Sequence, residues 1–276
     1  MMKKTVGLGV AASVVLAGGL AVAELREGYV YFEPSSEEHP LDEIISGREF
    51  RDDATRALQE DDFENPGFLS LEEGEELWST VDGSENKSCE SCHGDVAEGM
   101  AGVGSTYPKL MAQGGKTTLT NIENQINTCR TERMGAEAYK YDKPQLTGLT
   151  VLIKNVDRGE PVNVSTEGDY ESWFKKGEEL YYTRVGQLDM SCAHCHEEHY
   201  GEYIRADHLS QGQTNGFPTY RFKWQGMGSL HRRFSGCMKN IRGVPYAKGS
   251  DEFLALELYT AWRGQGLPVE TPSVRN

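Results

Sequence analysis

The chain has 276 residues and a formal net charge of −15, because 43 aspartates and glutamates outweigh 28 lysines and arginines. This length suggests two domains, and so acidic a chain lacks the basic surface that binds phosphates, which excludes a nucleic-acid-binding protein. Hydrophobic residues make up 37% of the chain, and glycine accounts for 31 residues. We therefore expect a loop-rich protein whose order depends partly on something other than an aliphatic core.

Residues 1–23 have the pattern of a cleaved secretory signal peptide. Two lysines precede an apolar run, Val6–Val22, and Ala21-Val22-Ala23 matches the small-residue cleavage site. A transmembrane anchor is the alternative, but a run of about 17 residues that includes four glycines is short for a bilayer. The sequence predicts export to an oxidising periplasm without a membrane span, where thiols persist only when they are paired, ligated or catalytic.

Residues 24–65 form an acidic extension that has no counterpart elsewhere in the chain. We expect this extension to cover the surface as short helices and loops. Its run of charged side chains is more typical of a solvated face than of a binding site.

An internal repeat organises the rest of the chain. Gly74–Trp78 and Gly177–Tyr181 share the order Gly-Glu-Glu-Leu-aromatic, and each precedes a Cys-x-x-Cys-His motif, at Cys89–His93 and at Cys192–His196. The offset is 103 residues at both elements, 177 minus 74 and 192 minus 89. Two elements in one register indicate a duplicated unit of about 100 residues.

Each repeat closes with an apolar, helix-like stretch, at Leu146–Val156 and at Phe253–Trp262. Both stretches end at an Arg-Gly pair with Pro-Val close behind, which is common punctuation for the end of a helix. A polar segment at 163–169 marks the seam between the repeats. We predict two tandem domains, 66–164 and 165–276.

Cys-x-x-Cys-His is the attachment motif of c-type haem. Its two thiols bond covalently to the haem vinyl groups, and the histidine then lies beneath the iron as its proximal ligand. A redox-active Cys-x-x-Cys or half of a zinc site is the alternative, but two motifs behind matching helices in an exported chain favour haem. We predict two covalently attached haem c groups in a mainly α fold with long irregular loops, built as two tandem class I cytochrome c-like domains. The residues that would hold them are Cys89, Cys92 and His93 in the first domain and Cys192, Cys195 and His196 in the second.

Each half has one further cysteine, Cys129 or Cys237, at a distance suited to a second axial ligand of the iron. A thiolate is a soft, anionic ligand that stabilises ferric iron. A disulfide between these two cysteines is an alternative, as is ligation by another side chain. The other candidates for axial ligation are Met134, Met227, Met238, His199 and His208. We expect thiolate ligation, with His93 and Cys129 on one iron and His196 and Cys237 on the other.

Cations surround only the second of these cysteines. Between His208 and Ser250 the sequence has no aspartate or glutamate but seven lysines and arginines. Cations near a thiol lower its pKa and attract anions, and arginine holds anions with its planar fork. Haem propionates would occupy one or two of these cations, and the excess favours an anionic substrate or partner. The seven are Arg221, Lys223, Arg232, Arg233, Lys239, Arg242 and Lys248.

Over essentially the whole exported part, the chain resembles the SoxA family, the haem-bearing subunits of the SoxAX cytochromes of bacterial sulfur oxidation. The most specific match runs from Gly216–Arg221 through Arg233–Cys237 to Asn240–Arg242. Both Cys-x-x-Cys-His motifs are present, so the chain is similar to the dihaem branch, whose irons have histidine and thiolate ligands. The family's active-site cysteine, found as a persulfide, corresponds to Cys237, and the arginine four residues before it corresponds to Arg233.

The resemblance implies an L-cysteine S-thiosulfotransferase, which joins thiosulfate oxidatively to a cysteine of a carrier protein, SoxY. Electrons would pass through haem to a SoxX-like monohaem subunit, bound as a heterodimer, and on to a small electron-acceptor cytochrome. Cys237 and Arg233 are then the expected catalytic residues, and the first haem is expected to be structural or a spectator. The rivals are a dihaem thiosulfate dehydrogenase that forms tetrathionate, a plain periplasmic electron-transfer cytochrome c, and a dihaem peroxidase, which paired cysteine ligands argue against.

Overall fold

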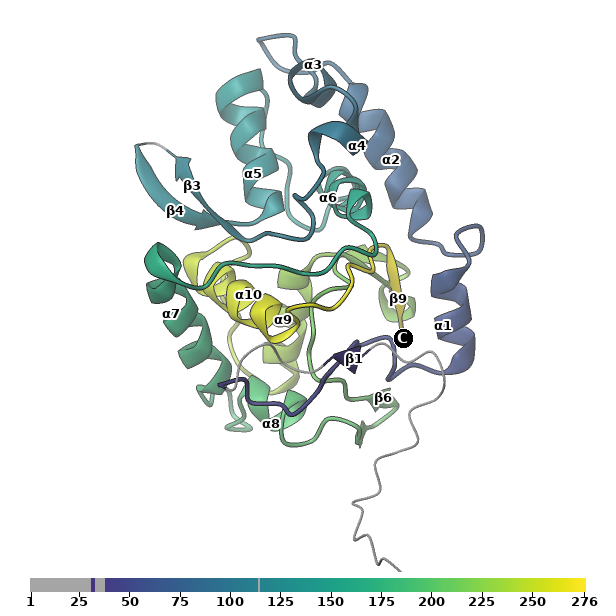
Figure 1. Cartoon of the computed structure of the whole chain (residues 1–276), viewed down its shortest axis with the longest axis vertical. Coiled ribbons are helices and arrows are strands. Elements are labelled where there is room, and N and C mark those ends of the chain that lie inside the picture. Colours follow the sequence, from purple (N-terminus) through teal and green to yellow (C-terminus); the bar gives the residue numbers. More distant parts are fainter. Residues whose placement is uncertain (1–30, 33–37, 114) are drawn as a thin grey trace, which may run out of the picture.

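The computed structural model describes residues 31–32, 38–113 and 115–276 (Figure 1). The signal peptide predicted for residues 1–23 lies outside the described residues. In Figure 1 residues 68–156, in blue and teal, lie above the second half of the chain, in green and yellow, whereas the purple segment before them lies beside that second half. Among the described residues, no helix has both the length and the apolar character needed to cross a membrane.

The first half is built on two long helices that pack against each other. These are α2 (Phe68–Ser79) and α6 (Pro144–Val156), and their apolar residues form one buried cluster. Shorter elements lie between them along the chain: α3 (Cys89–His93), α4 (Val96–Gly99), the hairpin of β3 (Lys109–Gln113) and β4 (Lys116–Thr120), and α5 (Ile122–Cys129), which continues into a π-helical turn at Arg130–Met134.

The second half repeats this plan. Helix α7 (Glu171–Tyr182) packs against α10 (Asp251–Arg263) as α2 packs against α6. The elements between them are α8 (Cys192–His196), the two-residue strands β5 (Tyr203–Ile204) and β6 (Asp207–His208), β7 (Thr219–Arg221), β8 (Gly226–Gly228) and α9 (Leu230–Asn240). The last strand, β9 (Ser273–Arg275), joins β7 in parallel.

The repeated glycine explains how each pair of long helices approaches so closely. A methyl group on Gly74 would collide with the carbonyl oxygen of Gly148, and one on Gly177 would collide with that of Ala255. The aromatic residue four positions later, Trp78 or Tyr181, is buried in the core of its own half. The Gly-Glu-Glu-Leu-aromatic repeat is therefore a helix-crossing motif, with glycine at the contact and the aromatic ring one turn further on.

The segments that follow the two closing helices pair with each other and join the halves. The Gly159 N–H donates to the Val269 carbonyl at 2.9 Å, and the Val162 N–H donates to the Leu267 carbonyl at 2.9 Å. The Val269 N–H returns a bond of 2.9 Å to the carbonyl of Glu160. The repeated Arg-Gly and Pro-Val punctuation thus forms part of the contact between the halves.

Charged side chains are also buried where the halves meet. Glu123 and His231 each lie two residues after the N-cap of their helix, α5 or α9, and so occupy matching positions. His231 Nε2 lies 2.9 Å from a Glu257 carboxylate oxygen on α10, and Asn121 Nδ2 donates to the same oxygen at 3.1 Å. A cavity of about 30 Å³, room for roughly one water molecule, is lined by Glu123, Glu257 and Lys154.

Glu123→Gln is expected to make the stability of the protein less dependent on pH. Burial and the nearby Glu257 raise the pKa of Glu123 to about 7, above its ordinary value of 4.5. The folded state therefore holds a proton that the unfolded chain releases between about pH 4.5 and 7, so this group makes folding less favourable as pH rises through that window. Between pH 5 and pH 8, the free energy of unfolding measured with denaturant should fall less in the variant than in the wild type, by on the order of 2 kcal/mol. An equal fall in the free energy of unfolding in both proteins would contradict the raised pKa of Glu123.

The acidic extension is anchored to the second half, not merely spread over it. Leu41, Ile44 and Ile45 are buried, the last two in the short strand β2 (Ile44–Ile45), which pairs with β1 (Tyr31–Phe32). Helix α1 (Asp53–Glu60) follows, capped by the Asp52 carboxylate, which accepts from the Thr55 N–H at 2.7 Å.

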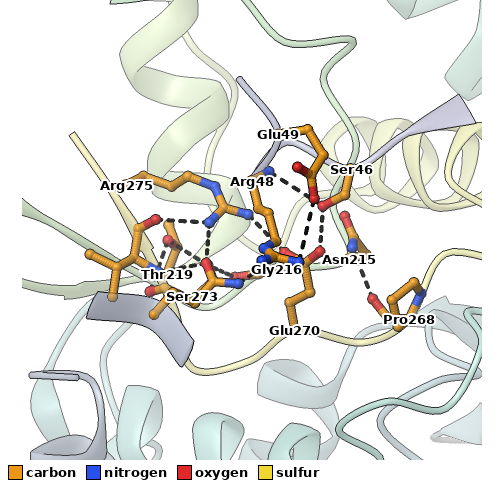
Figure 2. A network of polar contacts seen from close by, with 12 residues as sticks. Ser46, Arg48, Glu49, Asn215, Gly216, Thr219, Pro268, Glu270, Ser273 and Arg275 are labelled. Carbon is orange, nitrogen blue, oxygen red and sulfur yellow. Dashed lines mark hydrogen bonds and ion pairs between the residues drawn. The ribbon is translucent and has the colours of Figure 1, made fainter. Parts of the chain in front are cut away.

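Polar contacts complete this anchor (Figure 2). Ser46 donates to Glu270, Arg275 Nη2 lies 3.0 Å from another oxygen of Glu270, and the Ser273 hydroxyl donates to Thr219 at 2.8 Å. The expectation of a solvated charged face is wrong for Glu49, which is 6% exposed. Glu49 can be buried because arginines of the same extension pair with it, Arg48 at 3.4 Å and Arg56 at 3.2 Å.

Candidate functional site

The histidine of the second Cys-x-x-Cys-His motif is held in one orientation. His196 Nδ1 lies 2.7 Å from the Ser210 carbonyl, so Nδ1 carries the proton and donates it. Gly212 packs on the other side, where a methyl group would come within 2.9 Å of the imidazole ring; its φ of +79° also favours glycine. A carbonyl bond to one ring nitrogen is the usual support of a metal-binding histidine, and it leaves His196 Nε2 for a ligand.

Cys237 faces this histidine from helix α9. The helix begins at the Ser229 cap, whose hydroxyl accepts from the Arg232 N–H at 3.1 Å, and it presents Cys237 two turns later. Burial alone would raise the pKa of the Cys237 thiol, but Arg233, a hydrogen bond from His196 and the charge of Arg221 outweigh burial and lower that pKa to about 7. Cys237 is therefore the cysteine whose surroundings stabilise a thiolate.

The seven cations of the surrounding sequence do not gather at Cys237. Its cationic neighbours are Arg233, one turn earlier on α9, and Arg221, at the end of β7. Lys248 pairs with Asp142, and Arg232 lies 4.3 Å from the ring centre of Trp224. The other three are exposed: Lys223, Lys239 and Arg242. Of the seven cations, Arg221 and Arg233 are thus the two that lie near Cys237.

The first motif has a more open setting. His93 is exposed and its ring centre lies 5.8 Å from that of Trp78, whose indole N–H donates to the Gly94 carbonyl at 3.0 Å. Cys129 lies at the end of α5 within electrostatic range of Cys92, and burial raises the pKa of its thiol. No cation pair comparable to Arg221 and Arg233 shifts the thiol toward the thiolate in this half of the described chain.

The other sequence candidates for axial ligands are engaged elsewhere. Both ring nitrogens of His208 lie near carbonyl oxygens, at 3.1 Å from Phe50 and 2.9 Å from Gly201, and His199 Nδ1 is 3.2 Å from Glu202. The three methionines are buried or packed against the cores of the halves: Met134, Met227 and Met238. All six cysteines lie within the described residues and are free, so the alternative disulfide between Cys129 and Cys237 is absent.

These surroundings fit a covalently bound haem. Each half supplies two motif thiols, a histidine and a further cysteine, a donor set that matches attachment and axial ligation of one haem. In the second half the two donors also lie close together, since Cys237 is a neighbour of His196, whose Nδ1 is bonded to the Ser210 carbonyl.

Sequence reasoning missed Arg263, which supports the second motif from helix α10. Its side chain is 1% exposed, and its guanidinium lies 2.9 Å from the carboxylate of Glu197, the residue directly after His196. The guanidinium also lies 4.5 Å from the ring centre of Tyr181. In the sequence Arg263 reads only as a cation in the last turn of a helix, so nothing there pointed to this contact.

Comparison with known proteins defines the class of this protein. Residues 73–162 match the family model described as SoxA/TsdA, cytochrome c domain. Together with the helix crossings and the cysteine motifs, this match makes the chain a c-type cytochrome.

The particular family follows from whole-chain comparisons. Proteins named L-cysteine S-thiosulfotransferase subunit SoxA are 53% identical in Rhodovulum sulfidophilum, over 86% of this chain and 82% of the relative, and 46% identical in Paracoccus pantotrophus, over 86% and 80%. The crystal structure of SoxXA from P. pantotrophus matches with a TM-score of 0.82 at 46% identity, covering 86% of this chain and 89% of that one. The chain belongs to the SoxA family.

Proposed function

We propose that this protein is the catalytic subunit of an L-cysteine S-thiosulfotransferase. The reaction joins thiosulfate to a cysteine thiol of a SoxY carrier protein: one sulfur–sulfur bond forms, and one proton and two electrons are released. The observation that carries the proposal is the setting of Cys237, whose thiol lies near His196 and within electrostatic range of Arg233 and Arg221. An activated thiol beside cations suits a dianionic sulfur substrate.

Each side chain then has a defined task. Arg233 and Arg221 attract and orient the thiosulfate dianion, because a guanidinium fork matches two oxyanions. Cys237, as a thiolate or as a persulfide, transiently carries the sulfur substrate. His196, oriented by the Ser210 carbonyl, would hold the haem beside Cys237. Bound haem supplies the one-electron acceptor chemistry that these side chains lack.

We propose further that the protein carries two haem c groups. The first would be attached through Cys89 and Cys92, and His93 and Cys129 would bind its iron. The second would be attached through Cys192 and Cys195, and His196 and Cys237 would bind its iron. The domain limits that go with this assignment are an extension at 24–65 and haem domains at 66–164 and 165–276.

The proposed setting is a periplasmic heterodimer. A cleaved signal peptide at 1–23 would export the chain, and a SoxX-like monohaem cytochrome would bind it and pass electrons to a small acceptor cytochrome. The crystallised relative from P. pantotrophus is described as SoxXA, which supports such a pairing. A thiosulfate dehydrogenase is the rival function, since the matching cytochrome c family model is described as SoxA/TsdA.

One experiment separates the two functions. The purified haem-loaded complex is given thiosulfate and an electron acceptor, first without and then with the carrier protein. The proposal predicts that, beyond one equivalent per Cys237, thiosulfate is consumed only when the carrier is present, and that the carrier gains a thiosulfate adduct at one cysteine. Rapid tetrathionate formation without any carrier would support the dehydrogenase instead.

Arg233→Ala is expected to raise the thiosulfate concentration at half-maximal rate roughly 10- to 100-fold, the usual effect of losing a charged hydrogen bond. The maximal rate should fall less, because Cys237 and His196 remain. Rates measured over a wide thiosulfate range, with melting curves as a fold control, test this. An unchanged dependence on thiosulfate in a folded variant would remove Arg233 from the site.

A further inference from the structure

The acidic extension brings an arginine to the cationic side of the site. Arg51 lies between β2 and α1, and its neighbour Phe50 docks against the loop that follows the second motif. The Phe50 carbonyl lies 3.1 Å from His208 Nδ1, and the Phe50 ring meets the His208 ring edge-on at 5.4 Å. This docking directs the Arg51 guanidinium toward the His208 carbonyl, to which Nη2 donates.

Arg51 and Arg221 both donate hydrogen bonds to Asn276. Arg51 Nη1 donates to the side-chain oxygen of Asn276 at 3.4 Å, and Arg221 Nε donates to the Asn276 main-chain oxygen at 2.7 Å. Both partners of the Arg51 guanidinium are thus neutral oxygens, and its buried Nε has no hydrogen-bond partner among the described residues. Arg51 therefore retains both charge and an unused donor.

Three guanidinium groups lie near one another here. Arg51 and Arg221 both lie within electrostatic range of Arg233, the cation that most strongly lowers the pKa of the Cys237 thiol. The carboxylates near this group are Asp207, 3.7 Å from Arg221 with a side chain 43% exposed, and the main-chain carboxylate of Asn276, which accepts from Arg221 at 2.7 Å. Asp52 lies within electrostatic range of Arg51. Among the described residues, neither Arg51 nor Arg233 forms an ion pair with a carboxylate, so both guanidinium groups can still hold an anion.

A hollow of about 380 Å³ opens beside Arg51. Its lining includes acids, but these are committed to other contacts. Glu49 pairs with arginines of the extension, Asp52 caps helix α1, and Asp53 pairs with Arg56 at 2.5 Å. Arg51 is the one lysine or arginine among the described residues that line the hollow. Besides Arg51 and the three acids, the lining consists of Phe50, Tyr203, Ala206, His208 and Asn276.

We propose that Arg51 is a substrate-positioning residue, which binds the sulfur-containing dianion at the hollow and delivers it to Arg221 and Arg233 beside Cys237. This inference rests on the proposed function and deepens it. It assigns the extension, which has no counterpart in the first half, a part in recognising the anion. The fork of Arg51 would complete the coordination of an anion that the two other arginines hold from the side of the thiol.

The test compares Arg51→Gln, Arg51→Lys and a matched control, Arg158→Gln. Arg158 also bonds to the extension, at 2.6 Å from Asp62, so its loss changes the net charge equally without touching the hollow. In the haem-loaded complex, Arg51→Gln is expected to raise KM for thiosulfate roughly 10- to 100-fold with kcat little changed. Arg51→Lys should restore part of this, since lysine supplies charge without the fork. The control should match the wild type.

A second variant covers the possibility that Arg51→Gln fails to fold. Asn276→Asp keeps every arginine but places a carboxylate where Arg51 now meets an amide, and it should raise KM in the same direction. Unchanged KM values in folded Arg51→Gln or in Asn276→Asp would overturn the proposal, as would a fall in kcat at unchanged KM.

Calorimetric titration with thiosulfate separates this proposal from the function on which it rests. Wild-type complex that binds thiosulfate without conjugating it, together with lost binding in Arg51→Gln, would refute the reaction and support the anion site. Conjugation at normal KM in Arg51→Gln would support the reaction and overturn the role of Arg51.

Discussion

Cys237→Ser is expected to abolish thiosulfate conjugation, with a loss of roughly 10³-fold or more, the usual scale for removal of a catalytic nucleophile. Serine keeps the size of the side chain, but its hydroxyl neither ionises near neutral pH nor carries sulfur. The loss should appear in the maximal rate and not be overcome by more thiosulfate. Rates of adduct formation on the carrier, at saturating thiosulfate, measure it.

Lys239→Gln is the matched control for Cys237→Ser, because Lys239 lies on the same helix, is exposed and belongs to the same cationic stretch. This control should conjugate thiosulfate like the wild type. Haem content and melting temperature distinguish loss of chemistry from loss of fold. A plain electron-transfer cytochrome predicts the opposite pattern, in which Cys237→Ser changes the haem spectrum but leaves conjugation intact.

Arg263→Met is expected to destabilise the protein by about 3–5 kcal/mol, the usual cost of removing one partner of a buried ion pair. Methionine roughly preserves the volume but leaves the Glu197 carboxylate without the guanidinium that lies 2.9 Å away. The Tyr182 hydroxyl, 2.9 Å from the same oxygen, remains and compensates only in part. Denaturant unfolding of the haem-loaded protein gives the free energy.

Lys175→Met provides the comparison for Arg263→Met. Lys175 and Glu171 form an ion pair at 2.5 Å on the surface of α7, where both side chains are well exposed. Losing this pair should leave the free energy of unfolding almost unchanged, because water screens the interaction. Similar losses in both variants would show that Arg263 does not support the motif through a buried charge pair.

The repeat and the chemistry of its motifs could be predicted from the sequence, because both depend on local spacing. The Gly-Glu-Glu-Leu-aromatic pattern corresponds to a real helix crossing, and the expected closing helices are present at Pro144–Val156 and Asp251–Arg263. Helix caps at Ser88 and Ser191 start both cysteine motifs in the same way. Such features involve residues close in sequence, so periodicity and punctuation reveal them.

Contacts between distant segments could not be predicted in this way. The count of seven cations favoured an anionic substrate or partner, but pairing with Asp142 and stacking on Trp224 engage two of these cations elsewhere. Arg51 comes from a segment that composition marked as solvated. Its approach to Arg233 depends on how the extension docks, which no local pattern encodes.

Peptide mass spectrometry of Cys237 tests the central claim most directly. The haem-loaded complex is incubated with isotopically labelled thiosulfate and an electron acceptor without carrier, sampled, and then mixed with carrier. The account predicts labelled sulfur on the Cys237 peptide, lost from it as the label appears on the carrier cysteine. Conjugation of the carrier while Cys237 never acquires label, or label on another cysteine of the chain, would contradict it.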